Sequence, residues 1–297
     1  CSSRLESVHF GLHRQMKGVL MFNLFRRHSA VAVAVACVIA MLPSVALGNH
    51  SWGGYHWART SNPFNLKLGD NVSSQWDSIL ATTSSDWTQS TVLNTSIVAG
   101  QAKGRNCRPT AGRVEVCNAT YGNNGWLGLA QIWITGGEHI TQGVTKVNDT
   151  YFNTPTYNTT AWRNLVMCQE VGHTLGLDHQ DENFNNPNLG TCMDYTDNPG
   201  TNQHPNQHDY DELQLIYAHL DSSTTVGQSV SGPGNGQGNG QGGEHAAPPA
   251  MNQIDLDGPG QWGRIVRESR HNSLYELDFG NGDKIFTFVI WADVDEE

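Results

Sequence analysis

QEVGHTLGLDH, from Gln169 to His179, is the stretch around which the rest of this chain can be interpreted. Gln169 and His173 are four residues apart, so on a helix their side chains lie on one face and can bind the same ion. Gly176 permits the left-handed backbone that ends such a helix, and His179 then returns toward that ion. A reactive zinc site needs about three protein ligands and one open position. The spacing therefore predicts a metal site formed by Gln169, His173 and His179.

Glu170 follows the first of these residues directly and lies beside the face that carries the predicted ligands. A carboxylate in that position can take a proton from a metal-bound water and pass it to a leaving group. The spacing E-x-x-H alone is common by chance. Here it occurs within the full stretch, on a predicted helix, and Met193 follows in the sequence TCMDY. The combination indicates a hydrolytic metal centre with Glu170 as its general base.

The composition describes a loop-rich globular protein, because charged residues make up only 15% of the 297. The net charge of −11 argues against nucleic acid and anionic membrane surfaces as partners.

Near its beginning the chain has the layout of a secretory signal peptide. Met21 is a better candidate for the translation start than Cys1, and two arginines precede an apolar run from Ala30 to Leu42. Small residues follow, so we expect cleavage after Ala46 or Gly48 and export from the cell. A membrane anchor is the alternative, but the run is shorter than the ~20 residues that a spanning helix needs.

Export determines how the cysteines are interpreted. Cys1 and Cys37 fall in the segment that would be removed, which leaves an even set in an oxidising compartment: Cys107, Cys117, Cys168 and Cys192. Three pairings are possible. We favour Cys107 with Cys117, which would close a short hairpin, and Cys168 with Cys192, because each precedes a part of the predicted metal site by one residue. A Cys-rich zinc site is the alternative, but no C-x-x-C spacing supports it.

Hydrophobic periodicity predicts an α+β fold. Alternation predicts strands in HSWGGYHWA after Asn49 and over Val92–Ala99, Arg113–Cys117, Trp126–Ile134 and His139–Phe152. Helical spacing predicts helices over Ser74–Trp87, from about Ala161 through the metal-binding stretch, and over Asp209–Leu220. The last has Asp209 and Glu212 at capping-box spacing and a core stripe of Leu213, Ile216, Tyr217 and Leu220.

The predicted strand Trp126–Ile134 is apolar on both faces apart from Gln131. Its simplest interpretation is a buried strand. The functional hypothesis is an edge strand beside the cleft, where the backbone of Gly128, Leu129 and Ala130 would pair with an extended peptide substrate.

Composition divides the chain into four parts. We expect a leader and signal peptide over residues 1–48, a catalytic domain over 49–221, a Gly/Gln/Pro-rich linker over 222–250, and a small β-meander over 251–297. The sequence leaves open whether the meander docks on the catalytic domain or is an accessory binding module.

The segment from about Trp52 to Leu220 resembles the metzincin clan of zinc endopeptidases, and is most similar to its secreted bacterial matrixin-like members. The stretch from Gln169 to His179 matches the elongated pattern H-E-x-x-H-x-x-G-x-x-H except at its first position. The resemblance implies two halves that flank a cleft, and a turn with Met193 beneath the metal. It also implies a twisted mixed sheet, an active-site helix and a C-terminal helix.

Tyr195 matches the M-x-Y form in which astacin-like and serralysin-like members place a tyrosine near the metal. By resemblance Tyr195 would hydrogen-bond the oxyanion; the alternative is an ordinary half-buried tyrosine. A bridge between Cys168 and Cys192 would join the active-site helix to this turn. Calcium is a second possible cofactor, and the candidate oxygen donors are Asp181, Glu182, Asp194 and Asp197.

Gln169 stands where the pattern has its first histidine. An amide oxygen binds zinc less well than an imidazole does. Three accounts compete: a working third ligand in a weaker site, a lesion in a protein kept for binding, or a His codon misread as Gln. We favour the first, because a decayed enzyme has no need to keep the other five matching residues together.

Other candidates surround the stretch. His204 and His208 are four apart, but Pro205 between them favours a solvated loop, which would have to fold back to supply a ligand. Asp178 and Asp181 are candidates to orient imidazoles.

From the sequence we expect a secreted zinc-dependent endopeptidase that acts on protein or peptide substrates and is not inserted in a membrane after signal cleavage. The alternative is a catalytically silent extracellular binding protein that retains the fold. The sequence does not indicate the oligomeric state.

Overall fold

The computed structural model describes residues 49–227, 248, 250–251 and 254–293. The expected signal peptide lies outside these residues, as does most of the expected linker. The part of the chain from Gly48 onward forms one compact unit. Within the described ranges no helix combines the length and the apolar character needed to cross a membrane.

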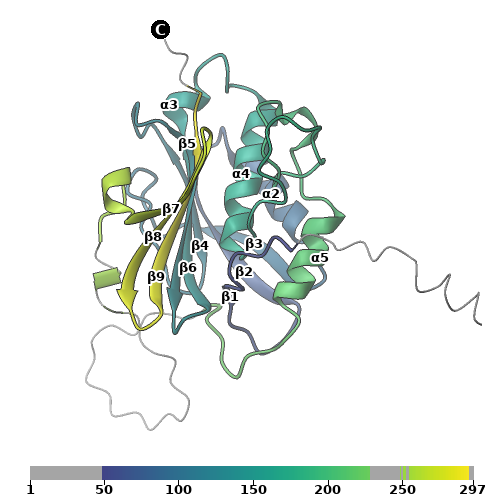
Figure 1. The fold of residues 1–297 in the computed structure, drawn as a ribbon, viewed down its shortest axis with the longest axis vertical. Coiled ribbons are helices and arrows are strands. Elements are labelled where there is room, and N and C mark those ends of the chain that lie inside the picture. Colours follow the sequence, from purple (N-terminus) through teal and green to yellow (C-terminus); the bar gives the residue numbers. More distant parts are fainter. Residues whose placement is uncertain (1–48, 228–247, 249, 252–253, 294–297) are drawn as a thin grey trace, which may run out of the picture. The chain divides into compact units, whose positions relative to one another are not determined.

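The protein has an α+β fold built on one mixed sheet (Figure 1). Along the sheet the strands follow the order β3-β2-β4-β6-β5-β9-β8-β7, and β1 pairs with β6. The strands from β3 to β6 are parallel, whereas β5, β9, β8 and β7 join antiparallel. Their bounds are His56–Trp57 (β1), Phe64–Asn71 (β2), Leu93–Ala99 (β3), Val114–Ala119 (β4), Trp126–Thr135 (β5), His139–Asn148 (β6), Arg264–Glu268 (β7), Asn272–Gly280 (β8) and Asp283–Trp291 (β9).

The helices are α2 (Asp77–Trp87), α3 (Asp149–Phe152), α4 (Thr160–Thr174) and α5 (Gln207–Ile216), with short 3-10 turns at Pro199–Thr201 and Pro259–Gln261. In Figure 1, α2 and α4 lie together beside the sheet, and α4 packs on β5 and β6. Thr159 caps α4, since its side chain accepts from the backbone N–H of Trp162. The first part of the stretch from Gln169 to His179 lies on α4, a helix buried between the sheet and α2.

The predicted helices and most predicted strands are confirmed, with several corrections. The alternating segment over β2 was missed, the first strand is only two residues long, and β6 ends at Asn148 because the chain turns there into α3. The cap of α5 is also different. Asn206 and Asp209 form its capping box in place of Asp209 and Glu212. Leu220 is 56% exposed and so lies outside the core stripe.

The expectation that Trp126–Ile134 forms an open edge is wrong. Strand β5 pairs with β6 on one side and with β9 on the other, where Gly128, Leu129 and Ala130 face Ile290, Val289 and Phe288. All ten residues of β5 are buried. Strand β5 is therefore an interior strand of the sheet with both edges paired, as expected for a strand that is apolar on both faces.

The C-terminal strands belong to the same sheet as the strands of the expected catalytic domain. Phe286 and Phe288 join the core cluster on the helical side of the sheet, which also contains Trp87 and Val166. A second cluster covers the opposite face, where Met251, Leu256 and Trp262 pack on β5. The β-meander is thus neither a separate module nor a unit with a core of its own.

Both favoured disulfides are confirmed. Cys107 is bonded to Cys117 and Cys168 to Cys192. The first pair closes a loop that leads into the parallel strand β4, and not the hairpin that was expected. The second joins α4 to the turn that carries Met193.

Replacing Phe286 tests whether the C-terminal strands are part of this core. Phe286 is 1% exposed and its ring lies 5.4 Å from Trp52 and 5.1 Å from Tyr55. We expect Phe286→Ala to lower the free energy of unfolding by about 3–5 kcal/mol. Ile265→Ala, at a position that is 49% exposed, should change it by less than about 1 kcal/mol.

The measurement is urea unfolding followed by the far-UV helical signal. That signal comes from α2, α4 and α5, which all precede the strands of the meander. A Phe286→Ala protein whose helices unfold at the wild-type urea concentration would show that the meander is energetically separate.

Candidate active site

His173 and His179 face each other at the centre of the molecule. Their Nε2 atoms lie 3.2 Å apart, and the rings are nearly perpendicular, with an interplanar angle of 76°. Both side chains are buried, His173 at 1% and His179 at 8% exposed. The structure therefore brings together the two histidines that the spacing predicted.

The opposite nitrogen of each ring faces an oxygen atom. His173 Nδ1 donates to the carbonyl oxygen of Leu177 at 2.9 Å, whereas His179 Nδ1 lies 3.3 Å from Asp178 Oδ1 without completing a hydrogen bond. Both oxygens favour a proton on Nδ1, which leaves the Nε2 lone pairs directed at one point. Burial lowers the pKa of both rings, and for His173 the neighbouring His179 lowers it further. Two neutral imidazoles thus point their lone pairs at each other.

A glycine turn returns the chain to place His179. Gly176 has φ +94°, and a Cβ there would lie 2.2 Å from the carbonyl oxygen of Tyr55. Glycine meets both requirements at once. The N-terminal segment fixes this turn, since Trp52 donates its N–H to Gly176 and Asp178 donates its N–H to the carbonyl of His50.

Glu170, on the same helix as His173, is also buried in the protein interior. It is fully buried, and a Cβ built on Gly128 of β5 would lie 3.1 Å from its Oε1. Neither carboxylate oxygen has a hydrogen-bond partner among the described residues. Burial raises the pKa of Glu170 well above its usual range. A buried acid without a partner is costly for folding and is characteristic of functional sites.

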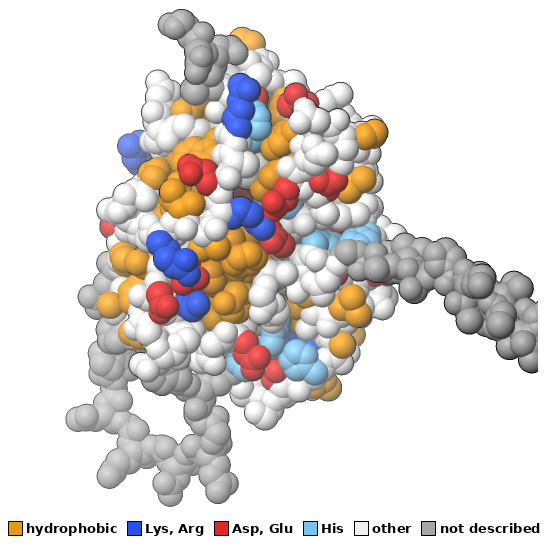
Figure 2. All heavy atoms as spheres, in the orientation of Figure 1, with side chains coloured by type: hydrophobic (Ala, Val, Ile, Leu, Met, Phe, Trp, Pro, Cys, Tyr) orange, Lys and Arg blue, Asp and Glu red, His pale blue; other side chains and the backbone are white. Residues whose placement is uncertain are grey.

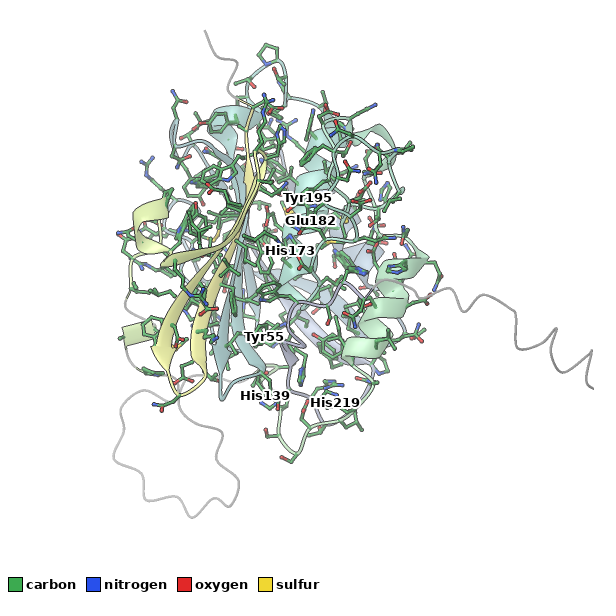
Figure 3. All side chains as sticks on the ribbon, in the orientation of Figure 1. Tyr55, His139, His173, Glu182, Tyr195 and His219 are labelled. Atoms are coloured by element: carbon green, nitrogen blue, oxygen red, sulfur yellow. A yellow bond between two sulfur atoms is a disulfide. The ribbon has the colours of Figure 1, made fainter. Side chains whose placement is uncertain are left out.

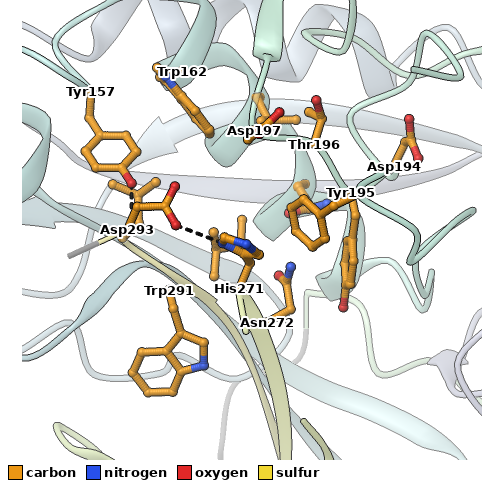
Figure 4. Close-up of a pocket in the computed structure, with 15 residues that line it drawn as sticks. Tyr157, Trp162, Asp194, Tyr195, Thr196, Asp197, His271, Asn272, Trp291 and Asp293 are labelled. Carbon is orange, nitrogen blue, oxygen red and sulfur yellow. Dashed lines mark hydrogen bonds and ion pairs between the residues drawn. The ribbon is translucent and has the colours of Figure 1, made fainter. Parts of the chain in front are cut away.

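Tyr195 lines a pocket (Figure 4), and Gln169 lines the same pocket. The pocket is small and partly open to solvent. Gln169 comes from α4, one turn before His173, and is 3% exposed. The ring of Tyr195 meets the ring of His179 edge-on at 4.2 Å, and burial raises the pKa of its phenol, which keeps the O–H as a donor.

Met193 lies directly against the active-site helix. Its side chain is fully buried, and a Cβ built on Gly172 would lie 2.6 Å from its Sδ. The neighbouring Cys192 is bonded to Cys168 of α4. The turn that carries Met193 and Tyr195 is therefore fixed to the helix that carries Gln169 and His173.

Arg267 of β7 is a site residue that the sequence analysis missed. Its guanidinium donates to both oxygens of Asp178, at 2.9 and 2.6 Å, and pairs with Glu182 at 2.7 Å. Burial alone would raise the pKa of Asp178, but His179 and Arg267 hold it well below its usual range. Asp178, His179 and Glu182 are close enough to hold a metal, but Arg267 already supplies the cation there.

The other predicted residues lie elsewhere. His204 pairs with Asp86 at 2.7 Å, and the ring of His208 stacks on that of His50 at 4.8 Å. Asp181 accepts from the backbone N–H of Asn183 and from the side chain of Asn186, so it does not orient a site imidazole. Of the remaining candidate calcium donors, Glu182 pairs with Arg267, Asp194 accepts from Leu189 and Asn202, and Asp197 lines the pocket.

The C-terminal strands cover the histidines. The ring of Phe288 in β9 stacks on His173 at 4.2 Å with an interplanar angle of 9°. Trp52 meets the edge of the same phenylalanine at 5.8 Å. Figure 3 labels His173 between these strands and α4, and Figure 2 shows an apolar surface, bordered by charged side chains, between the sheet and α4.

No protein-family model matches the chain, and no curated protein is significantly similar to it.

Proposed function

We propose that this protein is a secreted, zinc-dependent endopeptidase of the metzincin type. The observation that carries the proposal is the pair of Nε2 atoms of His173 and His179, which converge at 3.2 Å while their Nδ1 atoms are held from behind. The unpartnered carboxylate of Glu170 lies in the same interior.

The donor atoms fit a zinc ion. Ligands at about 2.0–2.1 Å from a tetrahedral centre lie about 3.3–3.4 Å from each other, close to the 3.2 Å observed between the two nitrogens. Gln169 would supply the third donor through its amide oxygen, which binds less strongly than an imidazole. When bound, zinc would polarise a carbonyl and lower the pKa of a water.

The protein's own residues then have distinct tasks. The charge of a bound zinc would oppose the effect of burial on the pKa of Glu170. Its carboxylate could then accept a proton from the water as the water oxygen bonds to the peptide carbonyl carbon, and deliver that proton to the amide nitrogen as the C–N bond breaks. Tyr195, whose burial keeps its phenol protonated, donates to the carbonyl oxygen as negative charge develops there. Asp178, held by Arg267, fixes the ring orientation of His179.

Several features support the metzincin type and the secreted location. Met193 packs beneath the helix that carries the ligands, and Tyr195 follows it at the expected distance along the chain. The two disulfides are typical of proteins that fold in oxidising compartments. Peptide substrates are the expected partners, and calcium remains a second candidate cofactor.

The observed conformation is closed to substrate. Strand β9 fills the place beside β5 where an extended peptide would pair, and Phe288 covers His173. Hydrolysis therefore requires β9 to move away from β5, or a substrate that enters from the pocket beside Gln169. The same burial favours one alternative function, a silent extracellular binding protein that retains the fold.

Zinc analysis combined with a Glu170→Ala variant separates the two functions. We expect the purified protein to contain zinc and to cleave an unstructured protein substrate in a chelator-sensitive manner. Glu170→Ala should keep the zinc and lose about 10²–10⁴-fold in hydrolysis. A wild-type protein without zinc or cleavage, and indistinguishable from Glu170→Ala, would support the binding protein.

Gln169→His tests the third ligand. An imidazole is a better zinc donor than an amide oxygen, so the variant should bind zinc more tightly. The measurement is competition for zinc with a chromophoric chelator. Weaker binding in Gln169→His would show that this side chain is not at the ligand position.

Glu182→Gln tests the closed conformation. Glu182 is partly exposed and pairs with Arg267 of β7, so its loss weakens the closed state by at most about 1 kcal/mol. Peptide hydrolysis should rise about two- to fivefold, since a larger share of molecules is open. The control is Glu268→Gln, an exposed carboxylate on the same strand. Unchanged hydrolysis with zinc retained would show that release of the C-terminal strands does not limit the reaction.

A further inference from the structure

A second group of histidines lies apart from His173, near one end of the molecule (Figure 3). His56 on β1 and His139 at the start of β6 are register partners on adjacent parallel strands, and their rings meet at 5.0 Å. His219 and Asp221 come from the segment that follows α5. Figure 3 shows His139 and His219 close together, away from His173 and Tyr195.

One carboxylate oxygen of this group faces three imidazole nitrogens. Asp221 Oδ1 lies 3.5 Å from His56 Nε2, 3.4 Å from His139 Nε2 and 3.5 Å from His219 Nε2. The Nε2 atoms of His56 and His219 are 3.2 Å apart. His56, His139 and Asp221 thus place their donor atoms within 4.8 Å of one another, and His219 reaches Asp221 and His56 from the segment after α5.

The distances to Asp221 Oδ1 favour a metal site over a hydrogen-bonded cluster. The three N···O separations exceed the 2.7–3.2 Å of good N–H···O hydrogen bonds, whereas the Nε2 atoms of His56 and His219 lie at hydrogen-bond distance. They match the edge of a zinc tetrahedron, about 3.3–3.4 Å for bonds of about 2.0–2.1 Å. A set of three imidazoles and one carboxylate is also a donor set that suits zinc.

Neighbouring groups hold these donors in place. His56 Nδ1 donates to the carbonyl of Gly54 at 2.8 Å, which leaves its Nε2 lone pair facing the group. The second oxygen of Asp221 accepts from the Arg59 guanidinium at 2.7 Å and from the Arg59 N–H at 3.0 Å. Oδ1 is therefore the oxygen that turns toward the imidazoles. This arrangement is the same as that around His173 and His179, where groups behind each ring fix its orientation.

The burial of these side chains also suits a metal ion that enters from solvent. The His56 side chain is 1% exposed and that of Asp221 9%, whereas that of His219 is 55% exposed. Three donors are thus preformed in the interior, and His219 can close over an entering ion.

We propose that His56, His139, His219 and Asp221 bind a structural zinc ion that joins β1, β6 and the segment after α5. This site shares no residue with the proposed active site and lies apart from it in Figure 3. With four protein ligands it leaves no position for substrate, as is usual for structural zinc.

The experiment measures zinc binding and stability with zinc ions alone. The full chain is stripped with a chelator and titrated with Zn²⁺ by calorimetry, and its Tm is recorded at each concentration. The test variant is His139→Ala/His219→Ala, with the milder His219→Ala alone as a second variant. The matched control is His204→Ala, because His204 is exposed to nearly the same extent as His219 and also pairs with a carboxylate.

We expect the double variant to bind one zinc fewer per chain than His204→Ala. At about 100 times Kd, this site should raise the Tm of the wild type and the control by about 5–10 °C, and the double variant should lose that increment. His219→Ala should bind more weakly at the same site. Tetrahedral Co²⁺ absorption should fall in parallel.

The difference of one zinc is expected whether or not the active site binds its own ion, so failure of the proposed peptidase leaves this readout intact. Equal zinc content and equal Tm shifts in the double variant and the His204→Ala control would overturn the proposal.

Discussion

The Nε2 atoms of His173 and His179 face each other in the protein interior, and the surrounding structure has to hold both rings in that position. His173 and His179 can present lone pairs at 3.2 Å only because both rings are held from behind and the chain reverses at Gly176. That reversal places a glycine against the backbone of Tyr55, so the N-terminal segment has to lie there too. Without a cation this arrangement is electrostatically unfavourable. The structure around it is stabilised by other contacts, chiefly the bridge to Cys192 and the packing of Met193 on α4.

The sequence predicted what local periodicity and spacing determine. Helix α4, both disulfides and the pairing of His173 with His179 follow from residues within one or two turns, or from simple counting. Arg267 was missed because it is 89 residues from Asp178, and no local pattern marks an arginine that will pair across a sheet. The cover over β5 was misjudged for the same reason, since an apolar strand can be buried by any later strand.

Strand β9 stabilises the fold and closes the site at the same time. Its inner face carries Phe286 and Phe288, both 1% exposed, so its place in the sheet contributes several kcal/mol through apolar burial. Full release of β9 is for that reason rare, and a peptidase of this design would be slow until a partner or a substrate competes for β5. Arg267 adds a polar contact that reaches His179 through Asp178. The strand that blocks the site thus also orients one of its imidazoles.

The N-terminal segment connects the two histidine groups. His50, Trp52 and Tyr55 brace the turn that places His179, and His56 is the next residue along the chain. A metal at the second group would fix the end of this segment to β6 and to the segment after α5. Fixing it removes freedom that the turn at Gly176 would otherwise have, because its packing partner can no longer move away. Occupation of the second group is therefore expected to favour the geometry of the first without any contact between them.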